Sequence, residues 1–238
     1  MKLNKTFITI ILILIISLII LTIPTINYKL KMENSQTNKQ STQKENLNPY
    51  LNSKSIPQEN IETATLAGGC FWCIEASLEQ INGIISVESG YTGGDINNPT
   101  YEQVSTGQTG HYEAVKVKYD KTIINYKTIL EKFFELFDPT DDTGSFSDTG
   151  SQYKSAIFYK NENQKQIAEQ LIQKLNKSKL YNKPIVTKLI ENQTFYIAED
   201  YHQDYYKKSS TRYNQYKKYS GRPQYFEKIK QKKEEINE

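Results

Sequence analysis

The stretch Thr63-Ala64-Thr65-Leu66-Ala67-Gly68-Gly69-Cys70-Phe71-Trp72-Cys73 organises the rest of the chain. An apolar, strand-like run leads into two glycines, and a helix-compatible run leads out of the second cysteine. The stretch holds both cysteines and the only tryptophan of the 238 residues. It predicts a strand, a turn and a helix that presents two thiols, with two aromatic rings between them, at its first turn.

The two thiols are expected to have unequal roles. A thiol at the first turn of a helix meets the positive end of the helix dipole, which favours the reactive thiolate. Cys70 is nearer the helix start, so we expect it to have the lower pKa and to attack. Cys73 lies on the same face, within reach of a disulfide after modest unwinding. A structural disulfide is the alternative, but its tiny loop would constrain little of the unfolded chain.

The first sixty residues differ from the remainder. Residues 6–26 carry no charge, and a helix of that length spans about 30 Å, the thickness of a bilayer core. We expect residues 1–27 to form a cytoplasmic stub and a transmembrane anchor; a cleaved signal peptide and a buried core helix are the alternatives. Positive charge lies on both sides of the run, but its slight excess before the run favours a cytoplasmic N-terminus and an extracytoplasmic catalytic domain. Residues 28–60 are polar and typical of a flexible tether.

Residues 61–225 predict one catalytic domain, and residues 226–238 a charged C-terminal tail. Strand patterns occupy residues 63–67, 84–91, 114–119, 155–159 and 184–190, and helical patterns occupy residues 70–81, 125–137, 161–174 and 198–206. Several strands follow one another closely. The fold class expected is α+β, a two-layer sandwich with a mixed sheet flanked by helices, preceded by a single transmembrane helix.

Composition excludes two classes of function. The net charge of +3 comes from 30 basic and 27 acidic residues that are intermixed, which is no nucleic-acid footprint. Two cysteines and two histidines are too few and too scattered for a zinc site, which needs about four ligands. A reversible disulfide is therefore the favoured chemistry of the cysteine pair.

Polar and aromatic residues elsewhere are candidates for the site around Cys70. Glu113 precedes a period-two strand, and a side chain at such a loop-to-strand junction can face a site. The other candidates are Phe71, Trp72, Tyr101, Asp148 and Tyr153. Each also fits an ordinary role as a packing, turn or solvated residue, and among 18 tyrosines a single one carries little information.

Five sequence blocks, in order across residues 63–206, resemble the A-type peptide methionine sulfoxide reductases. They are Gly69-Cys70-Phe71-Trp72 with Glu75; Gly90-Tyr91-Thr92-Gly93-Gly94 with Pro99-Thr100-Tyr101; Thr109-Gly110-His111-Tyr112-Glu113-Ala114-Val115; Asp138-Pro139-Thr140 with Asp148-Thr149-Gly150-Ser151-Gln152-Tyr153; and Ala198-Glu199-Asp200-Tyr201-His202-Gln203. One block would be weak, but five in family order are specific.

The resemblance implies a role for each candidate residue. Cys70 would be the nucleophile, Glu113 a protonated acid, Tyr101 and Tyr153 hydroxyl donors to the sulfoxide oxygen, Phe71 and Trp72 the site of the substrate methyl group, and Asp148 the organiser of the polar network. Many relatives carry resolving cysteines near the C-terminus, and this chain has none there. Cys73, at a position that is often Gly, is the only internal resolving thiol.

The implied activity is reduction of the S epimer of methionine sulfoxide, in proteins and as the free amino acid, for repair of oxidised proteins. It would need no cofactor and would draw electrons from thioredoxin or a similar protein, and the enzyme would be a monomer. A membrane-tethered thioredoxin-like thiol–disulfide oxidoreductase is the alternative. A non-enzymatic anchored binding domain, which would not depend on Cys70, is the third possibility.

Overall fold

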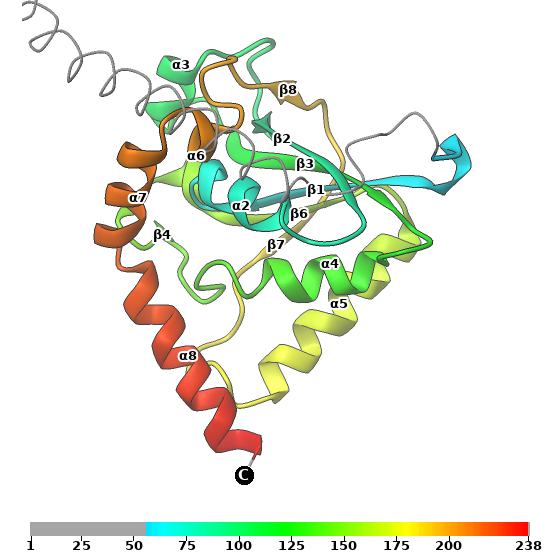
Figure 1. Ribbon diagram of the computed structural model, residues 1–238, viewed down its shortest axis with the longest axis vertical. Coiled ribbons are helices and arrows are strands. Elements are labelled where there is room, and N and C mark those ends of the chain that lie inside the picture. The colour runs from blue at the N-terminus through cyan, green and yellow to red at the C-terminus, as the bar shows by residue number, and fades with distance from the viewer. Residues whose placement is uncertain (1–55, 238) are drawn as a thin grey trace, which may run out of the picture. The chain divides into compact units, whose positions relative to one another are not determined.

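A six-stranded mixed sheet forms the centre of the fold (Figure 1). The structure, a computed structural model, describes residues 56–237, so the predicted anchor and most of the tether lie outside the described residues. The strand order is β7-β6-β1-β3-β2-β8, and every neighbouring pair is antiparallel except β6 and β7. The bounds are β1 Ile61–Gly68, β2 Ile84–Thr92, β3 Tyr112–Asp120, β6 Ser155–Tyr159, β7 Lys188–Glu191 and β8 Tyr196–Ile197.

Helices and short elements complete the described part of the chain. The α-helices are α2 Phe71–Leu78, α3 Tyr101–Ser105, α4 Tyr126–Phe133, α5 Glu162–Lys177, α6 Tyr205–Lys208, α7 Ser210–Tyr219 and α8 Arg222–Asn237. Two 3₁₀ turns, η3 Gln58–Asn60 and η4 Ser151–Tyr153, and a small hairpin, β4 Gly144–Ser145 with β5 Asp148–Thr149, lie between them. Figure 1 shows α7 followed by α8, which leads away from the sheet to the C-terminus.

Alternation along the central strands gives the sheet two apolar faces. Leu66 is in register with Val115 on one side and with Ile157 on the other, and all three are fully buried in the main core with α2, α4 and α5. The next residue, Ala67, points to the opposite face and belongs to a second, smaller cluster that includes Phe158. The two-layer packing thus follows from a period of two in β1, β3 and β6.

The mixed sheet flanked by helices confirms the predicted α+β class. Three elements differ from prediction. The strand expected at residues 184–190 is confined to β7, and the helix expected at residues 125–137 ends at Phe133. Residues 198–204 form turns instead of a helix, and Asp204, with a left-handed φ of 53°, sets the start of α6.

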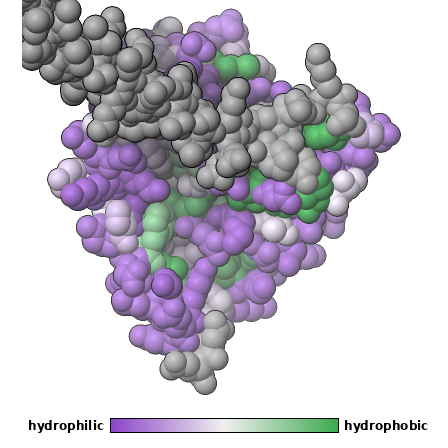
Figure 2. Space-filling view, in the orientation of Figure 1, coloured by the Kyte–Doolittle hydropathy of each residue, from purple (hydrophilic) through white to green (hydrophobic). Residues whose placement is uncertain are grey.

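The C-terminal segment is a charged helix. The helix α8 crosses the boundary that we predicted between residues 225 and 226 and continues to Asn237. Its sequence is rich in Lys and Glu, and Figure 2 shows a largely hydrophilic surface over this helix. Within residues 56–237, no helix combines the length and the apolar character needed to cross a bilayer.

Candidate active site

A tight turn places Cys70 at the start of α2. Gly69 has φ +91°, and a Cβ on it would lie 2.4 Å from Cβ of Ser145 in the hairpin. Only glycine combines this backbone conformation with so close an approach. Cys70 is the N-cap residue of α2, and Cys73 follows one turn along with its N–H bonded to the Cys70 carbonyl at 3.1 Å. Both thiols are free and buried.

Glu113 reaches the helix start from the neighbouring strand β3. Its Oε2 accepts a hydrogen bond from the backbone N–H of Phe71 at 3.1 Å, so it caps a donor that the helix itself leaves unpaired. The side chain is buried, and burial raises its pKa to about 8, against the opposing effect of the Phe71 hydrogen bond. A protonated carboxyl group beside Cys70 is thus the favoured form near neutral pH.

The two thiols have the reverse of the predicted pKa order. Burial raises the pKa of Cys70 well above its usual value, and the neighbouring Cys73 and Glu113 act in the same direction. The hydrogen bond from Cys70 lowers the pKa of Cys73 to about 7, and the charge of Arg222 contributes. The side chain of Cys70 makes no capping hydrogen bond, and Glu113 accepts from the first N–H of α2. The helix dipole alone predicts the lower pKa for Cys70, but burial raises the pKa of this thiol instead.

An aromatic cluster lies beside the thiols. The indole N–H of Trp72 donates to Nδ1 of His202 at 3.1 Å, and the Trp72 ring stacks on Tyr205 with centroids 3.9 Å apart. Phe71 packs on His202 and Tyr91 at 5.1 and 5.9 Å. Burial lowers the pKa of His202, which keeps the imidazole neutral and able to accept from Trp72. These rings form an apolar wall at the first turn of α2.

Tyr101 and Tyr153 come to the same site from α3 and η4. The backbone N–H of Tyr101 donates to Oε1 of Glu199 at 2.8 Å, and its ring lies 4.5 Å from that of His202. Burial raises the pKa of both tyrosines, and Glu113 is the next cause for each. Their hydroxyl groups therefore stay protonated and can donate near Glu113.

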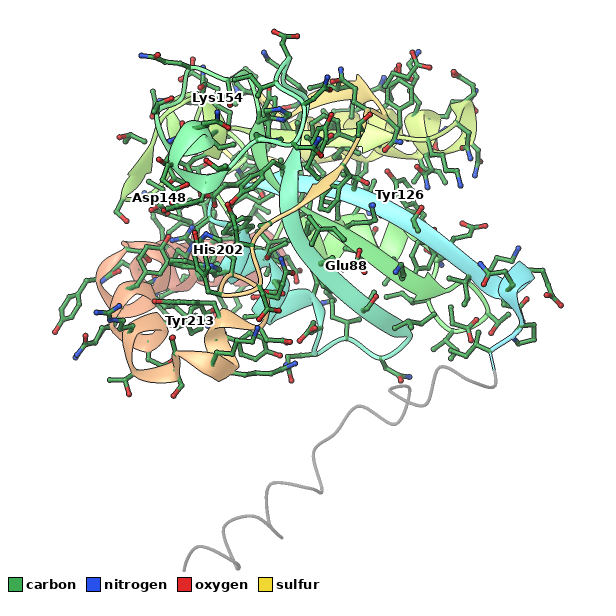
Figure 3. The ribbon with its side chains drawn as sticks, turned by 90° about the horizontal axis from the view of Figure 1, so that it is seen from above. Glu88, Tyr126, Asp148, Lys154, His202 and Tyr213 are labelled. Atoms are coloured by element: carbon green, nitrogen blue, oxygen red, sulfur yellow. The ribbon has the colours of Figure 1, made fainter. Side chains whose placement is uncertain are left out.

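Asp148 lies in the hairpin strand β5 and joins the site to the C-terminal helices. Its Oδ2 accepts a hydrogen bond from the hydroxyl of Tyr216 and forms an ion pair with Nη2 of Arg222 at 3.3 Å. Figure 3 shows Asp148, His202 and Tyr213 on one side of the molecule, away from Tyr126. The structure thus brings the predicted site residues together at one end of α2.

The peptide methionine sulfoxide reductase family matches residues 62–234 of this chain. The chain belongs to this family. The five sequence blocks predicted this membership, and it is confirmed.

The chain is 51% identical over 170 residues to peptide methionine sulfoxide reductase MsrA/MsrB of Vibrio cholerae, covering 71% of this chain and 45% of that protein. It thus spans less than half the length of that relative. Its identity to MsrA 2 of Staphylococcus aureus is also 51%, covering 70% of this chain and 94% of that one. Methionine sulfoxide reductase A of Corynebacterium diphtheriae matches with a TM-score of 0.57 and 33% identity, covering 64% of this chain and 77% of that structure.

Part of this reductase site was not predicted. The sequence assigned no role to His202, Tyr205, Tyr213, Tyr216 or Arg222. Tyr213 and Tyr216 are three apart on α7, a spacing that places them on one helix face. That signal is weak in a tyrosine-rich chain. Among the described residues, no group of three or more His, Cys, Asp or Glu side chains is arranged to hold a metal ion.

Proposed function

We propose that the protein reduces methionine sulfoxide to methionine, with Cys70 as the nucleophile. One observation carries this function: the buried carboxyl of Glu113, with a pKa of about 8, is hydrogen-bonded to the residue next to Cys70. A sulfoxide oxygen leaves sulfur only when it is protonated, and a neutral carboxyl group supplies that proton near neutral pH. Family membership and the aromatic wall for a methyl group support the same reaction.

In the first half-reaction, the sulfur of Cys70 attacks the sulfoxide sulfur while Glu113 protonates the oxygen. The hydroxyl groups of Tyr101 and Tyr153 stabilise the charge on that oxygen. Phe71 and Trp72 hold the methyl group. The oxygen then moves from the methionine sulfur to the sulfur of Cys70, as the S–S bond formed by the attack and the original S–O bond break. Cys70 becomes a sulfenic acid, methionine leaves, and the proton lost by the Cys70 thiol restores that of Glu113.

In the second half-reaction, Cys73 resolves the oxidised Cys70. Its sulfur attacks the sulfenic sulfur, the S–S bond forms, and the S–O bond breaks with release of water. The two thiols lie in one buried cluster, one helical turn apart, as this step requires. A thioredoxin-type protein then reduces the disulfide by thiol exchange, so no bound cofactor is needed.

The test is an assay of the purified full chain on the two epimers of methionine sulfoxide, free and in a peptide, with dithiothreitol as reductant. We expect methionine from the S epimer alone. Equal rates on both epimers would contradict the proposed stereochemistry, and no methionine from either would contradict the reaction.

A thioredoxin-like oxidoreductase is the other use of two such cysteines, but it is not favoured. Disulfide exchange involves no oxygen to protonate, so it leaves the neutral Glu113 and its neighbouring tyrosines without a task. Reduction of insulin disulfides at a rate comparable to sulfoxide reduction would revive it.

We further propose that residues 6–26 anchor the enzyme in a membrane as a single span and that the catalytic domain is extracytoplasmic. The uncharged length of this run supports the span, and the lysines before it support the orientation. Protease added to intact cells should then cleave the domain. Complete protection of the domain until the cells are broken would contradict this orientation, and a chain found wholly in the soluble fraction would contradict the anchor.

A further inference from the structure

Arg222 is a large buried cation with no role in the reaction described so far. Its side chain is the largest that is fully buried among the described residues, and it is only 1% exposed. It is the first residue of α8, within a lysine-rich segment outside the five sequence blocks. Charged side chains are almost never fully buried unless they are paired, so the partners of Arg222 determine whether its burial is compensated.

In the described part of the chain, the partners of Arg222 leave one of its donors unused. Nη1 donates to the hydroxyl of Tyr216 at 2.9 Å, and Nη2 lies 3.3 Å from the carboxylate of Asp148. That same carboxylate oxygen also accepts from Tyr216. The guanidinium lies 4.9 Å from the ring of Phe146, and Nε has no partner among the described residues. The carboxylate of Asp148 is thus shared between Arg222 and Tyr216, and within residues 56–237 the Nε–H of the buried cation is unpaired.

The cysteine pair is next to this guanidinium. A Cβ on Gly69, the residue before Cys70, would lie 3.5 Å from Nη2 of Arg222. Tyr213, from the helix preceding Arg222, is buried in one cluster with both thiols. The hydrogen bond from Cys70 lowers the pKa of Cys73 to about 7, and the charge of Arg222 acts in the same direction.

We propose that Arg222 is a positioning residue for the resolving step, in which its buried charge holds Cys73 as the thiolate that attacks oxidised Cys70. This role rests on the function proposed above, because it requires Cys73 to be the resolving thiol. The best attacking thiol has a pKa near the ambient pH, since it combines ionisation with nucleophilicity. The hydrogen bond from Cys70 supplies part of this ionisation, and the buried cation adds to it.

The resolving step conserves atoms and electrons. The Cys73 thiolate attacks the sulfur of the Cys70 sulfenic acid, the S–S bond forms, and the S–O bond breaks. The Cys73 sulfur is oxidised and the Cys70 sulfur is reduced. The departing hydroxide takes a proton from solvent or from Glu113 and leaves as water. Arg222 donates nothing and touches no reacting atom.

A single turnover without external reductant separates the two half-reactions. Methionine release reports the attack by Cys70, and loss of sulfenic acid that dimedone can trap reports the attack by Cys73. For Arg222→Met we expect methionine release within about twofold of wild type and sulfenic acid decay slowed about 5- to 50-fold at pH 7, the effect of raising a thiol pKa by about one to two. Arg222→Lys keeps the charge and should restore most of that loss.

The control is Arg212→Met, the same substitution at an exposed position on α7. It should leave both half-reactions unchanged. A purely structural role for Arg222 would slow methionine release and sulfenic acid decay together, and that result would overturn the inference. Equal rates in wild type and Arg222→Met would also overturn it. A wild-type enzyme that releases no methionine would instead overturn the proposed function.

The ionisation of Cys73 gives a second readout, which does not depend on turnover. Cys70→Ser leaves Cys73 as the only thiol, so the pH profile of its alkylation by iodoacetamide has one midpoint. The groups that face this thiol are Cys70, Glu113, Asp148, Tyr213, Tyr216 and Arg222. Adding Arg222→Met to Cys70→Ser should move the midpoint up, and adding Asp148→Asn should move it down, because Arg222 and Asp148 act on the thiolate in opposite directions. Equal midpoints in Cys70→Ser and in Cys70→Ser with Arg222→Met would overturn the role of Arg222.

Discussion

The two thiols share one cluster but have different surroundings. Cys70 faces Glu113, a neutral acid carried by the sheet, and its own pKa is raised by burial. Cys73 faces Tyr213 and the cation Arg222, which the C-terminal helices carry, and its pKa is about 7. The sheet side thus has the groups that deliver a proton to an oxygen, whereas the helix side has those that stabilise a thiolate. Each half-reaction draws on a different region of the chain.

Cys70→Ser tests the sheet side most severely. A serine hydroxyl is a far weaker nucleophile at neutral pH, so methionine release should fall to background in both single-turnover and steady-state assays. Circular dichroism should show an unchanged fold, because the substitution is small. If methionine were still released once per enzyme, a group other than Cys70 would have to be the nucleophile.

Cys73→Ser should separate the contribution of the sheet side from that of the helix side. Turnover with a thioredoxin-type donor should fall to background, yet each enzyme should still release about one methionine, because the sheet-side groups are intact. A small thiol reductant that attacks the sulfenic acid directly should restore part of the turnover. Multiple turnovers with the protein donor at the wild-type rate would exclude Cys73 as the resolving thiol.

Glu113→Gln keeps the shape of the acid and removes its proton. We expect methionine release to slow by about 100- to 10,000-fold, the usual contribution of a general acid. The carboxyl pKa is raised to about 8, so the protonated form is present below that pH and is lost above it. The wild-type rate of methionine release should therefore decline as pH rises through about 8, and the Gln variant should lack this decline.

Much of the sheet side could be predicted from sequence. Local pattern sets it: the strand-like runs around Leu66 and Val115 can be read from the sequence, and the turn at Gly69 is specified by glycine itself. The family blocks then supplied Glu113, which periodicity alone left as an edge residue. Its buried position depends on the pairing of β1 with β3, a long-range contact that no local pattern encodes.

The helix side was not predictable in the same way. Arg222 lies in a polar, lysine-rich segment, and its burial depends on how α7 and α8 pack next to the hairpin that carries Asp148. The pKa order of the thiols was predicted wrongly for a related reason. The helix dipole is a local effect, whereas the burial that raises the pKa of Cys70 arises only from tertiary packing.

The smallest effect is expected for a change at Tyr205, where the C-terminal helices contact the aromatic cluster around Trp72. Tyr205, from α6, stacks on Trp72 with ring planes 13° apart. Tyr205→Ala should raise KM for methionine sulfoxide about 2- to 10-fold with little change in the single-turnover rate at saturation, since an aromatic pair contributes about 0.5–1.5 kcal/mol. Tyr205→Phe keeps the ring and should resemble wild type, as should Tyr219→Ala at an exposed position. If KM rose equally in the Phe and Ala variants, the effect would be due to the hydroxyl group of Tyr205 and not to its ring. The C-terminal helices would then contribute a polar group on the side of Cys70 as well as on the side of Cys73.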